Sequence, residues 1–380
     1  MHHTGPIETI ISGGAFGLPT NGHEDMWRKA ARSAKKLVIV IANNPGKRPI
    51  FSNREIVGMI KTIVADIPNA EVRVVKDKYL VRYAQEIGAT HVFRGLRDYK
   101  DLSEEQVARS VNKVIAPNID ADYFIPDADK FQISSSMVLS LVGFEGWEEL
   151  VANYVHPAVL AKLIDWHYVR QHWRQFWNAV NAQDDETVMW NNIASRYGQD
   201  HRAYHNLLFH IALALREFDQ VKHMVDDPLA VEMALWYHDI EYDPARSDNE
   251  ARSAKFARAA ARKMGLDDGF GEKVANLIET ANYAGSRSIF ADSDTQILYN
   301  IDYSILGAQP PIYRRYARGI REEFSHVSDA AFATGRTTVL REILGSNKKA
   351  KIFTLKYFAS QLEAQARTNI KAEIESLKDL

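Results

Sequence analysis

The sequence predicts an α/β domain with a parallel sheet, followed by an all-helical domain. Two observations lead to this prediction. In the first part of the chain, five short runs rich in β-branched residues alternate with amphipathic segments, which is typical of a parallel sheet covered by helices. After about residue 156 the strand signals stop, and helical patterns continue to the end. We expect domains at residues 7–165 and 166–380, and a length of 380 residues suits this number of domains.

The expected strands of the first domain are short and apolar. Residues 37–42 (LVIVIA) are apolar at every position, as in a strand that is buried on both faces. We expect strands at residues 7–12, 37–42, 71–75, 91–93 and 121–125. The amphipathic segments between them predict helices near residues 24–35, 53–66, 80–87 and 103–115.

The expected helices of the second domain follow a long helical pattern around residues 156–180, which carries Trp166, Trp173 and Trp177. Proline and glycine mark the breaks between helices, for example at Pro244 and Gly265. We expect further helices near residues 184–197, 201–217, 228–241, 250–264, 269–283, 309–326 and 350–378.

The composition excludes several classes of protein. Apolar residues make up 46% and charged residues 25%, which rules out a disordered or collagen-like chain. A net charge of −2 argues against a nucleic acid or an anionic membrane as partner, because both require a basic surface. The lack of cysteine excludes thiol nucleophiles and thiolate metal sites. No apolar run is long enough to span a bilayer and no signal peptide opens the chain, so we expect a cytoplasmic protein.

A glycine-rich turn, Gly13–Gly17 (GGAFG), follows the first expected strand, and Thr20–His23 (TNGH) then begins the first expected helix. Small residues let the backbone approach a phosphate, and the amino end of a helix offers free N–H groups. A histidine at this point can donate a hydrogen bond to a phosphoryl oxygen as charge develops there. The pattern indicates a nucleotide site; the alternative is a tight turn that binds nothing.

Four motifs occur in order in this half: Thr20–His23 (TNGH), Asn44–Phe51 (NPGKRPIF), Arg94–Arg97 (RGLR) and Ile133–Ser136 (ISSS). With them, residues from about 10 to 162 resemble bacterial phosphopantetheine adenylyltransferases, a family of the nucleotidyltransferase superfamily with a Rossmann-like fold. The resemblance implies adenylyl transfer from ATP, with Mg²⁺, to 4′-phosphopantetheine, giving dephospho-coenzyme A and pyrophosphate. It also implies a homo-oligomer, since the family forms ring-like assemblies.

The resemblance implies a role for each matching residue. The catalytic side chains would be those of His23, Lys47 and Arg97. ATP would contact Gly14, Phe16, Gly22, His23, Arg97, Glu105, Ser134, Ser135 and Ser136. The phosphorylated acceptor would contact Ala15, Lys47, Tyr79, Leu80, Arg94 and Asn112.

One departure from the family pattern concerns the acceptor. The family has a threonine whose hydroxyl meets the acceptor phosphate, and this chain has Ala15. The sequence therefore leaves two alternatives beside phosphopantetheine transfer. The acceptor is another phosphate, such as nicotinamide mononucleotide, or the domain only binds nucleotide or coenzyme A and regulates the second domain.

Histidines and carboxylates recur in the helical half, at His205, His210, His238, Asp239 and Asp302. Imidazole and carboxylate together are ligands for one divalent ion of the Mn, Fe, Co, Ni or Zn type. An adjacent His-Asp in an apolar helical region is unusual, because burying an unpaired carboxylate is costly. His205 and His210 are five residues apart, about 140° around a helix, so both cannot point straight at one ion. The alternative is a hydrogen-bonded pair without metal.

Residues from about 166 to 349 resemble an uncharacterised HD-superfamily group of metal-dependent phosphohydrolases. The matching stretches are 204–210 (YHNLLFH), 234–243 (ALWYHDIEYD), 247–254 (SDNEARSA) and 301–307 (IDYSILG). The pattern implies an all-α HD domain that holds one divalent ion through His205 or His210 together with His238, Asp239 and Asp302, and that hydrolyses a phosphoester. The chain is thus predicted to be bifunctional.

Overall fold

The computed structural model describes residues 7–42, 49–96, 99–127, 130, 132–281, 292–345 and 351–380. The chain divides into two compact units, residues 1–167 and 168–380. The division falls within one continuous helix, α7 (Pro157–Ala179).

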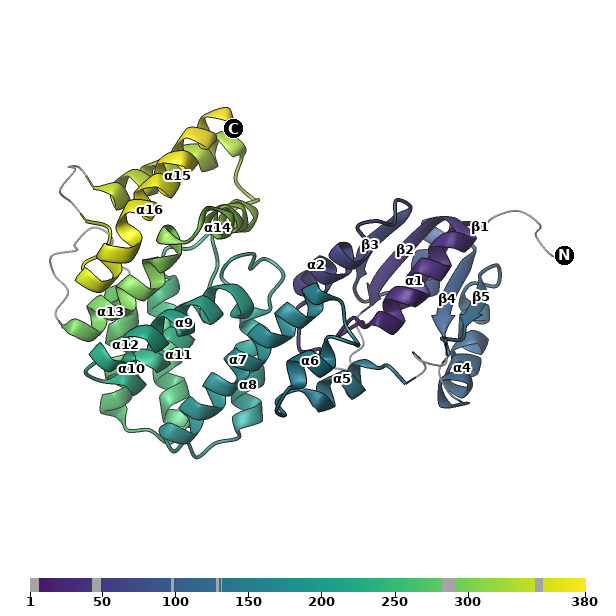
Figure 1. Cartoon of the computed structure of the whole chain (residues 1–380), viewed down its shortest axis with the longest axis horizontal. Helices are drawn as coiled ribbons and strands as arrows, with labels where there is room; N and C mark the ends of the chain where they lie inside the picture. Colours follow the sequence, from purple (N-terminus) through teal and green to yellow (C-terminus); the bar gives the residue numbers. More distant parts are fainter. Residues whose placement is uncertain are drawn as a thin grey trace. The chain divides into compact units, whose positions relative to one another are not determined.

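The first unit is built on a five-stranded sheet in the order β3-β2-β1-β4-β5, and every pair of neighbours is parallel. This confirms the predicted parallel α/β sheet, and the strand order is that of a Rossmann-like fold. Figure 1 shows α1 lying across the strands. The strands are β1 (Ile7–Gly14), β2 (Ala34–Ala42), β3 (Ala70–Val75), β4 (His91–Gly95) and β5 (Asp120–Phe124).

The helices of this unit alternate with the strands. They are α1 (Asn21–Ser33), α2 (Asn53–Ile63), α3 (Leu80–Glu86), α4 (Tyr99–Ile115), α5 (Ser135–Leu141) and α6 (Trp147–Val151). The first helix ends two residues before its predicted end, because Ala34 already pairs with Ile7 in the β1–β2 ladder. The second helix begins with a capping box, in which Ser52 and Glu55 satisfy each other's backbone N–H groups.

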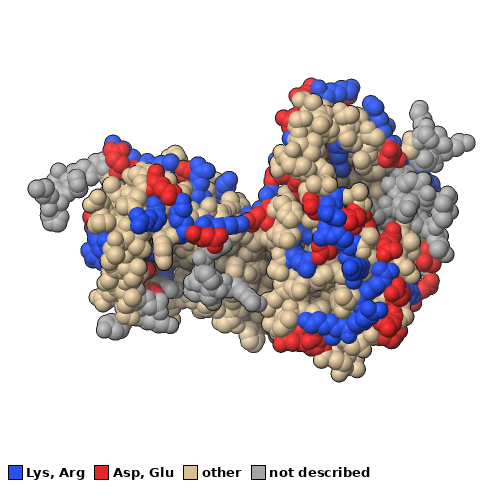
Figure 2. All heavy atoms as spheres, turned by 180° about the vertical axis from the view of Figure 1, so that it is seen from behind, with Lys and Arg blue, Asp and Glu red and all other residues tan. Residues whose placement is uncertain are grey.

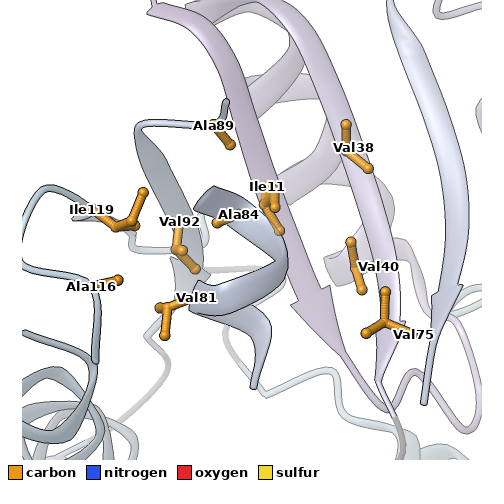
Figure 3. Close-up of a cluster of buried hydrophobic side chains, with 10 residues drawn as sticks. All are labelled: Ile11, Val38, Val40, Val75, Val81, Ala84, Ala89, Val92, Ala116 and Ile119. Carbon is orange, nitrogen blue, oxygen red and sulfur yellow. The ribbon is translucent and has the colours of Figure 1, made fainter. Parts of the chain in front are cut away.

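Both faces of the central strands are buried. Ile11, Val38 and Val92 pair in register and contribute to one apolar cluster, into which Val81 and Ala84 of α3 also pack (Figure 3). The alternate residues of β2, including Leu37, Ile39 and Ile41, are equally buried on the opposite face. Continuous apolar strands such as β2 are therefore explained by helices covering both sides of the sheet.

The strand order places a ligand site at one edge of the sheet. The chain leaves β1 toward β2 on one side and returns to β4 on the other, so the order reverses between β1 and β4. Ligands of open α/β sheets bind outside the carboxyl ends of the strands at this point. Here those ends are Gly14 and Gly95.

The second unit is helical, and its described residues contain no strand. Trp173 packs against Trp177, Trp190 and Trp236 in its interior. The last three long helices, α14, α15 and α16, lie together in Figure 1. The elements after α7 are α8 (Glu186–Tyr197), the π-helix η1 (Leu207–Ile211), α9 (Ala212–Val221), the 3₁₀-helix η2 (Lys222–Met224), α10 (Pro228–Tyr237), α11 (Asn249–Lys263), α12 (Asp268–Ala281), α13 (Ser293–Asp302), the 3₁₀-helix η3 (Tyr303–Gly307), α14 (Pro310–Glu323), α15 (Asp329–Leu344), α16 (Lys356–Ser376) and the 3₁₀-helix η4 (Leu377–Asp379).

The sequence prediction differs from the structure at several helices of this unit. Helices α13 and α15 were not predicted. The helix expected at residues 201–217 begins only at Leu207, with Asn206 as its cap and a π-helical first turn. The helix expected at 228–241 ends at Tyr237, so His238 and Asp239 follow its last turn.

Charged side chains of both signs are interspersed over the face shown in Figure 2. In the described part of the chain, no helix combines the length and the apolar character that crossing a bilayer requires.

Candidate nucleotide site and candidate metal centre

A cavity of about 850 Å³ opens at the carboxyl ends of β1 and β4. Its volume lies within the range of about 300–1,000 Å³ that is usual for small-molecule sites. Ten of the residues predicted to bind ATP or the acceptor lie in its wall: Gly14, Ala15, Phe16, Gly22, His23, Leu80, Arg94, Glu105, Ser135 and Ser136. The fold thus brings together residues from four separate parts of the sequence.

The turn after β1 is packed tightly. A Cβ atom on Gly13 would lie 2.3 Å from Leu80 Cδ2, and one on Gly14 would lie 3.0 Å from the ring of Phe16. Phe16 has a φ of 42°, a left-handed conformation that residues with side chains rarely adopt. This conformation turns its ring toward His23 and Trp27, with centroid distances of 5.3 and 5.1 Å. The turn is therefore held in one shape by its neighbours.

His23 is oriented by the cap of α1. Its Nδ1 lies 3.1 Å from the backbone nitrogen of Thr20 and 3.0 Å from the Thr20 hydroxyl. A backbone N–H can only donate, so Nδ1 is the acceptor and the neutral ring carries its proton on Nε2. The ring also stacks on Trp27 at a centroid distance of 5.9 Å. The cap and this stacking hold the ring in place, and His23 is part of the cavity wall.

Arg94 and Glu105 brace the end of β1. The Nη1 of Arg94 donates to the carbonyl of Gly13 at 2.6 Å, and its Nε lies 3.6 Å from a Glu105 oxygen. Glu105 comes from α4, so one ion pair ties this helix to the carboxyl ends of two strands. The guanidinium both supports the turn and lines the cavity.

The serine triplet begins α5. Ser134 accepts the backbone N–H of Met137 at 3.1 Å as the helix cap, and its side chain is not in the cavity wall. Ser135 donates to the carbonyl of Leu18 at 2.7 Å, which holds this segment against the turn before α1. Ser136 is exposed and lines the cavity.

The remaining predicted residues of this site lie elsewhere. Tyr79 is 66% exposed and is not part of the wall. Asn112 borders a separate small recess beside Arg109. Lys47 and Arg97 lie outside the described residues.

The sheet order and the histidine-bearing turn at its reversal point define the first unit as an α/β nucleotidyltransferase domain. A family model described as cytidylyltransferase-like matches residues 11–140. The phosphopantetheine adenylyltransferase of Neisseria meningitidis serogroup C is 35% identical over 157 residues, which are 41% of this chain and 92% of the relative. Those of Chromobacterium violaceum and Thiobacillus denitrificans are 31% and 34% identical, over 96% and 94% of their lengths and 42% and 41% of this chain. Through its N-terminal part, the chain belongs to the phosphopantetheine adenylyltransferase family.

Three side chains of the second unit lie close enough together to share one ion: His210 of η1, and His238 and Asp239 after α10. Asp302, at the end of α13, lies beside the two histidines. The Nε2 atoms of His210 and His238 are 2.7 Å apart. Asp239 Oδ2 lies 3.1 and 3.4 Å from them, and Asp302 Oδ1 lies 3.6 Å from each. Ligand atoms bound to one ion at about 2.0–2.2 Å are about 2.8–3.6 Å apart. Four of these five distances lie in that range and the distance between the two histidines lies just below it, so the spacing is close to that of a metal site.

The outer nitrogens of both imidazoles are held by the protein. His238 Nδ1 lies 2.9 Å from the carbonyl of Leu235, which can only accept, so Nδ1 carries a proton. His210 Nδ1 lies 2.9 Å from the hydroxyl of Tyr204. In neutral His238 the inner Nε2 therefore presents a lone pair, as in metal sites whose histidines donate outward.

Burial and charge act against each other in this cluster. Burial disfavours a charged His238, yet Asp239 and Asp302 outweigh it and raise its pKa to about 9. Burial lowers the pKa of His210. Burial opposes ionised carboxyls, but the neighbouring imidazoles hold the pKa values of Asp239 and Asp302 below their usual range. Without a metal, the cluster is a buried network of opposite charges.

A buried glutamate fixes the orientation of the His205 side chain. Glu323 has a fully buried side chain and accepts from the backbone N–H groups of Tyr204 and His205, from the Tyr242 hydroxyl at 2.8 Å and from His205 Nδ1 at 2.6 Å. Burial opposes its charge, but His205 and the N–H donors lower the pKa of Glu323 to about 2. His205 Nε2 is left 3.9 Å from Asp239 Oδ2. His210 Nε2, at 3.1 Å, is the closer of the two histidines to Asp239, and it is His210 that belongs to the cluster.

Sequence reasoning missed two residues that shape this site. Arg202 is 1% exposed and donates to the carbonyls of Asp239 and Ile240 at 2.6 and 3.0 Å, which fixes the backbone after α10. Its position three residues before His205 was the available signal. Glu323 lies 118 residues from His205, and no local pattern distinguishes it from Glu322.

Proposed function

We propose that the first unit transfers the adenylyl group of ATP to 4′-phosphopantetheine. A phosphate oxygen of the acceptor forms a bond to the α-phosphorus, the bond from that phosphorus to the β-phosphate oxygen breaks, and pyrophosphate leaves. The observation that carries this proposal is the fixed ring of His23 in the wall of the cavity, with Nε2–H as a donor. Such a donor stabilises negative charge on a phosphoryl oxygen without reorganising. The names of the relatives support the acceptor.

The bound ATP would carry Mg²⁺ on its phosphates, and the chain's own contribution is position and charge. The glycine turn lets the nucleotide approach the backbone, and Arg94 and Ser136 line the same cavity. No covalent intermediate on the protein is needed.

A second acceptor class is favoured by Ala15, which lines the cavity without a hydroxyl. The test is pyrophosphate release from ATP and Mg²⁺ with 4′-phosphopantetheine or nicotinamide mononucleotide. Release with phosphopantetheine supports the first proposal, and release only with the mononucleotide supports the second. Binding of ATP without pyrophosphate release for either acceptor would instead indicate that the first unit senses nucleotide and does not transfer the adenylyl group.

We also propose that this unit forms a homo-oligomer. Val107, Val111 and Val114 are exposed on α4 at a spacing that places them on one helix face. Light scattering on the purified chain tests this, and Val111→Glu should shift the mass toward the monomer. A monomeric wild type would refute it.

A second function is favoured by the cluster of His210, His238, Asp239 and Asp302. We propose that these side chains hold one divalent ion and that the second unit hydrolyses a phosphoester. The ion would supply a Lewis acid and activate water there. A water oxygen forms the new bond to phosphorus, the bond to the ester oxygen breaks, and the alcohol departs with a proton from the water. His205 Nε2 borders the same space and could contact the phosphate.

Metal analysis of the purified chain tests this function. Asp239→Ala should remove both bound Mn²⁺, Fe²⁺ or Zn²⁺ and phosphatase activity, while adenylyl transfer persists. Asp219→Ala is a matched control, because Asp219 also pairs with a histidine, His172 at 3.0 Å, outside the cluster. If Asp239→Ala retains its metal, or the wild type binds none, the cluster is only a structural ion-pair network.

A further inference from the structure

A second cavity, of about 660 Å³, lies beside the candidate metal cluster. His205 and Asp302 are in its wall, so the cavity reaches the cluster. Most of the wall is apolar and comes from η3, from α14 and the turn after it, and from α15. It includes Ile305, Leu306, Ile320, Phe324, Phe332 and Ile343. A phosphate held at the cluster would therefore have its ester group next to an apolar wall.

Three tyrosines of this cavity have protein partners for their hydroxyls. The Tyr204 hydroxyl lies 2.9 Å from His210 Nδ1, and the Tyr242 hydroxyl donates to Glu323 at 2.8 Å. The Tyr316 hydroxyl accepts from Arg336 at 3.0 Å. Because these hydroxyls already have protein partners, the tyrosines contribute aromatic surface to the wall.

The cavity offers little positive charge to a ligand. Arg336 is the only arginine or lysine among the described residues of the wall. Its Nε donates to Glu373 at 2.8 Å, and both side chains of this pair are at least nine-tenths buried. Its charge is thus balanced inside the protein. The other ionisable residues of the wall are His205, which contacts the buried Glu323 at 2.6 Å, and the carboxylates Glu250 and Asp302.

We propose that the second unit acts on phosphate monoesters of uncharged, largely apolar alcohols, with the aromatic or branched group of the alcohol in this cavity. The inference rests on the proposed phosphohydrolase function. It disfavours nucleoside di- and triphosphates and sugar bisphosphates, because Arg336 and His205 of the wall already pair with buried carboxylates and a further phosphate would need another cation. Small hydroxylated alcohols would leave the apolar wall uncovered.

Gly335 allows a direct test. It lines the cavity on α15, and a Cβ atom built on it meets nothing within 4 Å, so a longer side chain can start there and we expect Gly335→Leu to occupy part of the cavity. Ala330→Leu is the matched control, since it enlarges an exposed residue of the same helix that is not in the wall. The full chain with Mn²⁺ is assayed with benzyl phosphate and ethyl phosphate, both esters of primary alcohols. Binding of benzylphosphonate and ethylphosphonate, which cannot be hydrolysed, is measured by titration calorimetry.

We expect kcat/KM for benzyl phosphate to exceed that for ethyl phosphate at least about 10-fold. Burying even one additional carbon group in an apolar pocket gives a preference of about this size. Gly335→Leu should remove this preference in both turnover and phosphonate binding, and Ala330→Leu should keep it. Tight binding of benzylphosphonate without hydrolysis of either ester would retain the cavity assignment and refute the hydrolase function. Equal turnover of both esters, no phosphonate binding, or an unchanged preference in Gly335→Leu would overturn the inference.

Discussion

Exchanging His23 for asparagine or glutamine distinguishes the roles of the two nitrogens of its ring. Nδ1 accepts the Thr20 N–H at 3.1 Å, and Nε2–H is the donor that we propose for the phosphoryl oxygen. An asparagine amide reaches about as far as Nδ1, so His23→Asn can keep the cap and loses the donor. A glutamine amide reaches about as far as Nε2, so His23→Gln can keep a donor and loses the cap.

The two variants should therefore fail in different ways. Loss of one transition-state donor lowers turnover by about 10²–10³, or about 2.7–4 kcal/mol. His23→Asn and His23→Ala should show this loss with ATP affinity nearly unchanged. His23→Gln should retain more turnover and instead lose about 0.5–1.5 kcal/mol of stability with the Thr20 hydrogen bond. Pyrophosphate release, calorimetric ATP binding and urea unfolding measure the three quantities.

Equal turnover rates in His23→Asn and His23→Gln would contradict this assignment, because the donor would then not be on Nε2. Near-normal turnover in His23→Ala would remove this residue from the mechanism. A large fall in ATP affinity with unchanged turnover would make His23 a ground-state contact only.

Three further predictions concern single positions. Ala15→Thr should tighten phosphopantetheine binding by about 0.5–1.5 kcal/mol in the pyrophosphate assay, and weaker binding would indicate a different acceptor. Gly58→Ala, in the exposed interior of α2 where a Cβ meets nothing within 4 Å, should stabilise the first unit by about 0.5–1 kcal/mol in thermal unfolding; Gly88→Ala, at a φ of +70°, should destabilise it. Burial disfavours charge on His172, but Glu232 and Asp219 raise its pKa above 6.5, so its contribution to stability should be complete below about pH 6.5 and disappear as the pH rises through the folded pKa. His172→Gln should flatten this part of the stability–pH curve, and an unchanged curve would contradict the assignment.

The sheet was predictable because its signals are local. Every residue of LVIVIA at 37–42 is apolar and four of the six are β-branched valine or isoleucine in succession, which is typical of a strand covered on both faces. The turn after β1 was predictable for the same reason, since its glycines and the helix start follow one another in the chain. The boundary of α1 was less accurate, because Ala34 is a good helix former that the β1–β2 ladder holds in a strand.

The second unit was harder to predict, because contacts between residues far apart in the sequence determine which of its segments are helical and how its side chains are oriented. Helix α15 contains Gly335 and the β-branched Thr337, Thr338 and Val339, which are weak helix formers, and tertiary packing of Phe332 and Leu340 compensates. The spacing of His205 and His210 suggested that both could not face one ion. It could not show that Glu323 turns His205 aside, because that contact joins residues 118 positions apart.

The π-helical turn η1 has a consequence for how this site can change. The N–H of Ile211 donates to the carbonyl of Asn206 at 3.4 Å, five residues back, so the turn holds one residue more than an ordinary helical turn. Such a turn is equivalent to a single-residue insertion in an α-helix. Deleting Leu208 would restore regular hydrogen bonding and rotate the segment before it by about 100° relative to α9. If His210 keeps its place relative to α9, the segment carrying Tyr204 and His205 moves, so a chain without Leu208 would gain helix stability and lose the contact between the Tyr204 hydroxyl and His210 Nδ1.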